Sequence, residues 1–137
     1  MKITILTYGS RGDVQPFLPL SLGLLPRCKM IIHHGGAGTT SAGLRAGIPN
    51  IIVPFTADQP FWGNRVHAIG AGPKPILVRK LSVEKLTRAI AEAEENDVRK
   101  RAQVIGQGIR GENGVKCAAE LIEEYLFNGD QEQYFKV

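Results

Sequence analysis

Short apolar runs rich in β-branched residues recur along the first part of the chain. They lie at residues 3–7, 30–32, 51–53 and 76–78. Segments with helical patterning follow the first three runs, at residues 16–25, 40–46 and 60–69. Short strands that alternate with helices predict a parallel sheet with right-handed crossovers. We therefore expect an α/β fold, a Rossmann-like parallel sheet of about four strands with flanking helices.

The chain beyond residue 80 predicts three amphipathic helices. Ser82 is placed to cap the first, and Leu81 and Leu86 occupy the two positions of a hydrophobic staple. Apolar residues then recur at helical spacing over 83–93, 98–109 and 115–126. Right-handed crossovers leave one face of the sheet for these helices or a partner molecule to cover. We therefore expect self-association or marginal stability.

Length and composition are those of one globular domain, with 137 residues of which 43% are hydrophobic and 22% charged. Cys28 and Cys117 form no disulfide framework and have no metal-ligand partners at the usual spacing. The apolar start of the chain is too short for a signal peptide, and no stretch approaches the roughly 20 apolar residues that span a bilayer. We therefore expect a cytoplasmic protein with reduced thiols.

The formal net charge is +4. The densest basic run, residues 99–101, has no aromatic neighbours, which favours a solvated helix face over a nucleic-acid site. A mild positive excess still favours an anionic ligand, or peripheral association with an anionic membrane surface.

A glycine-rich loop at residues 34–40, HGGAGTT, follows the second predicted strand and opens a helix. Glycines let the backbone approach a bulky anion, and a helix start offers N–H groups and the positive end of its dipole. The hydroxyls of Thr39 and Thr40 add further donors, as does the imidazole of His34 at the entrance of the loop. Together these groups predict a phosphate or pyrophosphate site, although such loops are also common as plain structure. The loop is not a P-loop, because no Gly-Lys-Ser/Thr follows it.

His33 and His34 stand side by side at the start of this loop. Adjacent residues of an extended strand point in opposite directions. We therefore expect one imidazole in the core and the other at the surface, which argues against a metal site made of both.

Further residues carry candidate chemistry, each with a plainer structural alternative. The carboxylate of Asp58 and the amide of Gln59 can bind adjacent hydroxyls of a sugar, but Asp58 can equally cap the helix that follows. Trp62 offers a platform on which a sugar could stack, although packing explains it better. Asp13, in the first turn, could accept the proton of an attacking hydroxyl, or it could be a helix cap.

A resemblance to a known family runs over residues 31–65, IIHHGGAGTTSAGLRAGIPNIIVPFTADQPFWGNR. This segment resembles the donor-binding signature of UDP-dependent glycosyltransferases with two facing Rossmann-like domains (the GT-B fold), in particular sterol 3-beta-glucosyltransferases and bacterial relatives. By this resemblance, the residues that bind the donor pyrophosphate are His34, Gly36, Gly38, Thr39 and Thr40. Those that bind the donor sugar are Asp58 and Gln59. The family generally works without a bound metal, so we expect no cofactor or metal beside the UDP-sugar.

Residues 7–17, TYGSRGDVQPF, resemble another part of the same family, the opening of its amino-terminal acceptor-binding domain. There the residue that matches Asp13 is a candidate general base. We therefore divide the chain into a remnant of the acceptor domain (1–26), a partial donor domain (27–128) and a tail (129–137). The division implies an internally truncated enzyme.

The resemblance implies transfer of a hexose, with glucose expected, from a UDP-sugar to a lipid-like hydroxyl such as that of a sterol, with inversion. Correct positioning of acceptor and donor can be worth roughly 7–11 kcal/mol, so we expect little activity without an acceptor wall. Two alternatives stay open: a UDP- or phosphate-binding module without turnover, and a structural remnant that binds nothing.

Overall fold

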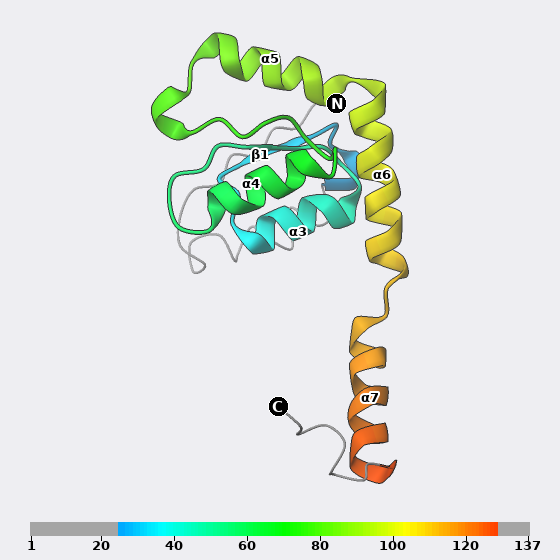
Figure 1. Cartoon of the computed structure of the whole chain (residues 1–137). Helices are drawn as coiled ribbons and strands as arrows, with labels where there is room; N and C mark the ends of the chain where they lie inside the picture. Colours follow the sequence, from blue (N-terminus) through cyan, green and yellow to red (C-terminus); the bar gives the residue numbers. More distant parts are fainter. Residues whose placement is uncertain (1–24, 129–137) are drawn as a thin grey trace.

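A computed structural model of the chain describes residues 25–128 (Figure 1). The elements, in chain order, are η1 (Leu25–Arg27), β1 (Ile31–His33), α3 (Ala37–Ala46), β2 (Asn50–Ile52), α4 (Gln59–Ala68), η2 (Val78–Lys80), α5 (Val83–Glu94), α6 (Asn96–Gly111) and α7 (Gly114–Asn128). The predictions for the first strand, for the helix that follows it and for Asp13 lie outside the described residues.

β1 and β2 form a parallel pair, in register from Ile31 opposite Asn50 to His33 opposite Ile52. α3 makes the crossover between them. It ends at Gly47, whose φ of 74° is the left-handed conformation that glycine adopts readily at a helix C-terminus. The strand–helix–strand unit confirms the predicted α/β class, and Gly47 confirms the predicted helix stop.

The predicted strand at residues 76–78 is wrong. The segment does run beside β2, since the N–H of Ile76 donates to the carbonyl of Ile52 at 3.0 Å. However, Pro54, which follows β2, has no N–H with which to return a bond to the carbonyl of Ile76, and the chain turns into the 3-10 helix η2 from Val78. Within the described residues the sheet has two strands, fewer than the sequence predicted.

Helices cover both faces of this small sheet (Figure 1). On one face, Ala89 and Ala93 of α5 pack against Ile51. On the other face, Val66 of α4 packs with Ile52. Burial of these side chains removes apolar surface from water on both sides of the sheet. The first of the C-terminal helices thus provides the cover that the strand pattern required.

α5 and α6 confirm their predicted positions. Ser82 Oγ accepts a hydrogen bond from the N–H of Lys85 at 3.3 Å, which confirms the predicted cap of α5. α6 crosses α3 at close range, because a Cβ on Gly106 would lie 2.6 Å from Gly47 Cα and 2.8 Å from the carbonyl oxygen of Leu44. Glycine at position 106 therefore lets the two backbones meet.

α7 confirms the third predicted helix, but its side chains up to residue 126 lie in solvent. Residues 111–126 are all exposed, and apolar side chains such as Val115 (87% exposed) and Leu126 (68% exposed) face solvent. The helix leads away from the body of the molecule (Figure 1). Across the described part of the chain, no helix combines the length and the apolar character that crossing a bilayer requires.

Candidate functional site

The loop between β1 and α3 turns sharply at Gly35, whose φ is +93°. A Cβ at this position would lie 2.6 Å from the Cγ2 atom of Ile52 and 3.1 Å from the carbonyl oxygen of Gln59. Glycine is therefore the residue that fits, in backbone conformation and in space. The contact with Gln59 brings the glycine loop against the start of α4.

Buried hydrogen bonds from His33 hold this loop to β2. The N–H of Gly35 donates to His33 Nδ1 at 3.0 Å, so Nδ1 carries no hydrogen and Nε2 is the protonated nitrogen. His33 Nε2 donates to Asn50 Oδ1 at 3.0 Å, and Asn50 Nδ2 donates to the carbonyl of Ile48 at 2.9 Å. We name this chain of groups, Gly35, His33, Asn50 and Ile48, the histidine latch.

Burial keeps the latch histidine neutral. His33 is 3% exposed, and the loss of solvation lowers its pKa to about 4, against the opposing effect of its hydrogen bond with Asn50. A proton on Nδ1 would displace the N–H of Gly35, so the neutral ring is what holds the loop amide. His33 is therefore the core imidazole that the strand pattern predicted for one of the two histidines.

His34 is half-buried and lies at the loop's entrance. Its ring is nearly perpendicular to that of His33 (88°), with 6.4 Å between the ring centroids. The ring covers Gly36, since a Cβ on Gly36 would lie 2.6 Å from His34 Nε2. His34 Nδ1 is buried and has no hydrogen-bond partner among the described residues. The imidazole thus lies over the residue that immediately precedes α3.

α3 begins with backbone donors that the helix itself does not use. Gly36 is the N-cap and provides no side-chain cap. The first intrahelical bond runs from the N–H of Thr40 to the carbonyl of Gly36 at 2.9 Å, so the N–H groups of residues 37–39 precede it. A Cβ on Gly38 would meet no atom within 4 Å, which leaves the space over this turn open. Thr39 beside it is half-buried.

Thr40 is engaged in two different ways at this helix start. Its N–H bonds within the helix, as above, while its side chain is 2% exposed. Its Oγ1 is buried and has no hydrogen-bond partner in the part of the chain that the structure describes. The amide of Thr40 is therefore used by the helix, while its buried hydroxyl is left without a partner among the described residues.

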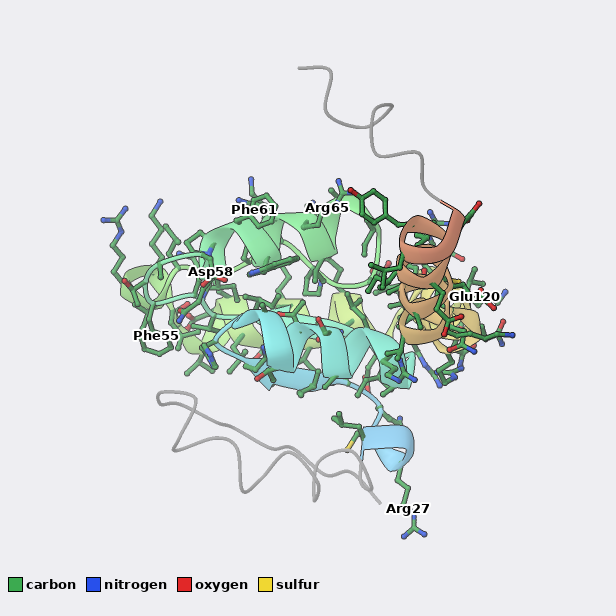
Figure 2. The ribbon with its side chains drawn as sticks, turned by 90° about the horizontal axis from the view of Figure 1, so that it is seen from below. Arg27, Phe55, Asp58, Phe61, Arg65 and Glu120 are labelled. Carbon is green, nitrogen blue, oxygen red and sulfur yellow. The ribbon has the colours of Figure 1, made fainter. Side chains whose placement is uncertain are left out.

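Asp58 and Gln59, at the start of α4, are oriented by hydrogen bonds. Gln59 Oε1 accepts from the N–H groups of Phe55 (2.8 Å) and Thr56 (3.1 Å), so the Nε2 amide is the end that can donate to a ligand. Asp58 occupies the N-cap position without capping the helix. Its Oδ2 accepts instead from Trp62 Nε1 at 2.7 Å. Figure 2 shows Asp58 and Phe55 at the same end of the molecule.

Trp62 therefore orients Asp58. The indole is half-buried and stands edge-on to Phe61, with 5.1 Å between the ring centroids. The segment before Asp58 is strained, because Ala57 has a φ of 54°, which residues other than glycine rarely adopt. Such conformations cost of order 1–3 kcal/mol and cluster at functional sites.

Sequence reasoning missed Asn50, the partner of His33. It is fully buried at the head of β2, and a Cβ on Gly43 of α3 would lie 2.2 Å from its Oδ1, so a glycine makes room for the amide. A polar residue at the head of an apolar strand was the available signal, because a buried amide needs partners.

The chemistry assembled at this loop suits an anion beside hydroxyl groups. An imidazole and free helix-start N–H groups can stabilise negative charge, while the carboxylate of Asp58 and the amide of Gln59 can pair with hydroxyls. Among residues 25–128, no group of three or more histidine, cysteine, aspartate or glutamate side chains is placed to hold a metal ion.

Known proteins that resemble the chain are glycosyl transferases. The family described as "Erythromycin biosynthesis protein CIII-like, C-terminal domain" matches residues 12–123. Sterol 3-beta-glucosyltransferase UGT80A2 of Arabidopsis thaliana is 47% identical over 108 residues, which make up 79% of this chain and 17% of that protein. O-mycaminosyltylonolide 6-deoxyallosyltransferase of Streptomyces fradiae is 37% identical over 103 residues, 74% of this chain and 24% of that protein.

Solved structures agree with these sequence matches. The glycotransferase of kitacinnamycin superposes with a TM-score of 0.69 at 28% identity, over 76% of this chain and 27% of that one. The calicheamicin glycosyltransferase CalG4 superposes with a TM-score of 0.67 at 25% identity, over 77% of this chain and 28% of that one. The chain thus spans a minor part of each relative, and it belongs to the UDP-glycosyltransferases of the GT-B fold, within the erythromycin biosynthesis protein CIII-like C-terminal domain family.

Proposed function

We propose that this chain carries the pyrophosphate and sugar contacts of a UDP-sugar site, in an enzyme that transfers a hexose to a lipid-like hydroxyl with inversion. The relatives named sterol 3-beta-glucosyltransferases favour glucose as the sugar and a sterol as the acceptor. The proposal for donor binding rests on the residues described above. The proposal for sugar transfer concerns a whole enzyme like the relatives, and this chain matches a minor part of each of them.

The contact between Gly35 and Gln59 is the observation that carries the proposal. Through it, the start of α3 and the Asp58–Gln59 pair meet at one junction, so a single ligand can reach both. A diphosphate suits the first, because N–H donors and the helix dipole stabilise negative charge. Sugar hydroxyls suit the second, because a carboxylate accepts hydrogen bonds and an amide donates them.

Two orphaned polar atoms support a polar ligand at this loop. Among the described residues, His34 Nδ1 and Thr40 Oγ1 are the buried side-chain nitrogen and oxygen atoms without a hydrogen-bond partner. Leaving such a group unsatisfied costs about 1–3 kcal/mol. Both belong to the glycine loop, and a bound polar ligand with its waters would satisfy them.

In the proposed reaction, a hydroxyl of the acceptor attacks the anomeric carbon of the sugar and UDP departs, so negative charge grows on the diphosphate. His34, the N–H groups at the start of α3 and the dipole of that helix stabilise this charge without a bound metal. Asp13 accepts the proton of the acceptor. Its role rests on the family resemblance, because it lies outside the described residues.

Calorimetric titration of the full chain with UDP tests donor binding. Gly38→Ala adds a methyl group that meets no protein atom within 4 Å but projects into the open space over α3, so we expect about tenfold weaker binding. Gly108→Ala, which also faces open space but on α6, is the matched control and should bind UDP like the wild type. A wild type that does not bind UDP, or a Gly38→Ala variant that binds it equally well, would contradict the proposal.

Release of UDP from UDP-glucose on addition of a sterol tests transfer separately. We expect little release from this chain, and we expect Asp13→Asn to abolish what release the wild type shows, with UDP affinity unchanged and with no effect of a chelator on either. UDP binding without sterol-dependent release in the wild type would instead support a binding module without turnover.

A further inference from the structure

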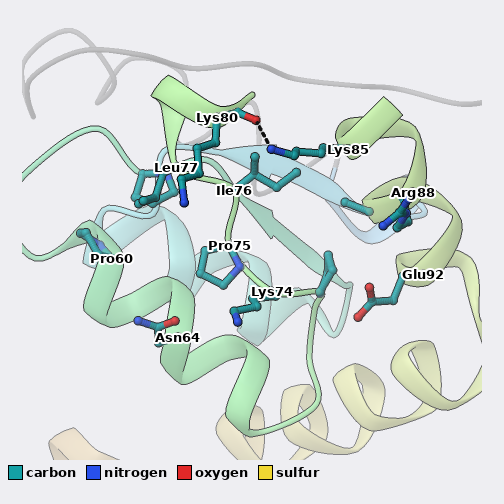
Figure 3. A pocket seen from close by; sticks show the side chains of 13 residues that line it. Pro60, Asn64, Lys74, Pro75, Ile76, Leu77, Lys80, Lys85, Arg88 and Glu92 are labelled. Carbon is teal, nitrogen blue, oxygen red and sulfur yellow. Dashed lines mark hydrogen bonds between the residues drawn. The ribbon is translucent and has the colours of Figure 1, made fainter. Parts of the chain in front are cut away.

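A pocket lies at the edge of the sheet, between α4, the segment that follows it and α5 (Figure 3). Its volume of about 510 Å³ falls within the range of small-molecule sites, roughly 300–1,000 Å³. The residues that line it include none of those proposed to bind the donor. The proposed function therefore leaves this pocket without a role.

The pocket combines an apolar floor with a cationic rim. The apolar side chains are chiefly Pro54, Pro60, Pro75, Ile76 and Leu77. The cationic side chains, all exposed, are Lys74, Lys80, Lys85 and Arg88. Glu92 is the one carboxylate of the lining. A ligand that fits this lining has an apolar body and a negative charge.

Glu92 lies in the same lining and Glu84 acts electrostatically on Lys85, but among residues 25–128 no salt bridge is described for the cations of the rim. The ion pairs described for residues 25–128 lie elsewhere, between Lys29 and Glu94 (3.6 Å) and within α7. Lys85 Nζ donates instead to the main-chain carbonyl of Lys80 at 3.0 Å, the dashed line of Figure 3, which places the Lys85 ammonium at the rim of the pocket. Charges of one sign gathered around a hollow attract an anion.

We propose that this pocket binds a phosphate group carried on an apolar body, the chemistry shared by a soluble phosphoester and a lipid headgroup. Arg88 can bind two phosphate oxygens with its planar fork, and the lysines add point charges. Ile76, Leu77 and the prolines cover the apolar body. A bare inorganic anion would leave the apolar side chains of the pocket exposed to water. A neutral apolar ligand would remove water from the cations without providing a counter-charge.

The chain's backbone at this edge does not suit a peptide strand. Pro73 and Pro75 have no N–H groups to pair with an added strand. The carbonyl of Leu77 already accepts from the N–H of Lys80 at 2.8 Å. The edge is thus closed to strand addition, which leaves the side chains of the pocket to recognise the ligand.

Titration of the full chain with hexyl phosphate tests the proposal, with hexanol and inorganic phosphate as matched probes. We expect hexyl phosphate to bind about tenfold more tightly than either probe and to shift the amide resonances of Ile76 and Leu77. The double variant Lys74→Gln, Arg88→Gln should weaken this binding about tenfold. The double variant Arg99→Gln, Lys100→Gln removes the same charge from exposed positions on α6 and should not.

The proposal would be overturned if inorganic phosphate bound as tightly as hexyl phosphate, or if both double variants lost the same affinity for hexyl phosphate. Either result would mean that the net charge of the protein alone attracts the ligand. Vesicles of phosphatidylglycerol and of phosphatidylcholine then identify the source. Binding to the former that the pocket variant loses and the control keeps assigns the ligand to a lipid, and its absence assigns it to a soluble phosphoester. Both double variants should keep their UDP affinity, so this proposal and the proposed function fail separately.

Discussion

The imidazole of His33 lies between the N–H of Gly35 and the side chain of Asn50, and a single neutral tautomer satisfies both neighbours. Buried polar groups stabilise a protein only while their partners are in place. The latch therefore couples the shape of the glycine loop to a protonation state. The donor site depends in this way on a residue that has no proposed contact with the donor.

The free energy of unfolding should fall as the pH falls from 6.5 to about 4. The pKa of His33 is lowered from 6.5 to about 4 in the folded protein, so the unfolded state binds more protons in this window. Stability that is fully present above pH 6.5 is lost progressively toward pH 4, by roughly 3 kcal/mol. Urea unfolding at a series of pH values measures this loss. His33→Asn should flatten the dependence over the same window, and an unchanged slope would exclude His33 as its source.

Trp62→Phe should weaken the binding of UDP-glucose more than that of UDP. The indole N–H holds Asp58 at 2.7 Å, and phenylalanine keeps the packing but cannot donate. We expect about a tenfold loss for UDP-glucose, the size of one hydrogen bond to a charged group, and little change for UDP. Calorimetry with both ligands measures the difference, with Phe61→Leu as the control at a position that is 62% exposed. Equal losses for both ligands would rule out a sugar contact through Asp58.

At the scale of elements, the positions of the helix ends are determined by residues close to those ends in the sequence. The hydroxyl of Ser82 and the missing Cβ of Gly47 each satisfy a helix end within a few residues, so both could be predicted from the sequence. The outcome at residues 76–78 could not be predicted in this way, because a strand also needs partner groups on a neighbouring segment, and Pro54 lacks the N–H that would bond to the carbonyl of Ile76. Contacts between helices depend on the tertiary structure in the same way.

Gly106→Ala should destabilise the protein, whereas Gly108→Ala on the same helix should stabilise it. A Cβ at 106 would come within 2.8 Å of backbone atoms of Gly47 and Leu44, and overpacking costs typically about 1–3 kcal/mol. A Cβ at 108 meets nothing within 4 Å, and alanine gains up to about 1 kcal/mol of helix propensity. Urea unfolding measures both. Two changes of the same sign would mean that α3 and α6 do not pack as described.

At the scale of the whole molecule, the packed body and α7 differ in how much apolar surface they bury. The body buries a core of apolar residues on both faces of the sheet, whereas the large apolar side chains described for α7 lie in solvent. Self-association, expected from the sequence, stays a prediction that sedimentation velocity over a range of concentrations can measure.

Ile122→Ala should change the free energy of unfolding of the dissociated chain by less than about 0.5 kcal/mol, whereas Ile51→Ala should lower it by about 2–5 kcal/mol. Ile122 of α7 is 59% exposed, and Ile51 of β2 is fully buried. Urea unfolding at low protein concentration compares the two. A large loss for Ile122→Ala would show that α7 packs against the body after all.

The sequence by itself determined the family, the helix ends and the residues of the glycine loop, because these depend on near neighbours or on a long run of specific residues. The tertiary structure decided which histidine is structural, which atoms of Asp58 and Gln59 remain for a ligand, and that a cationic pocket exists at the sheet edge. Each of these depends on hydrogen bonds and packing between residues far apart in the chain. Only the fold brings Asn50 to His33 and Gln59 to Gly35.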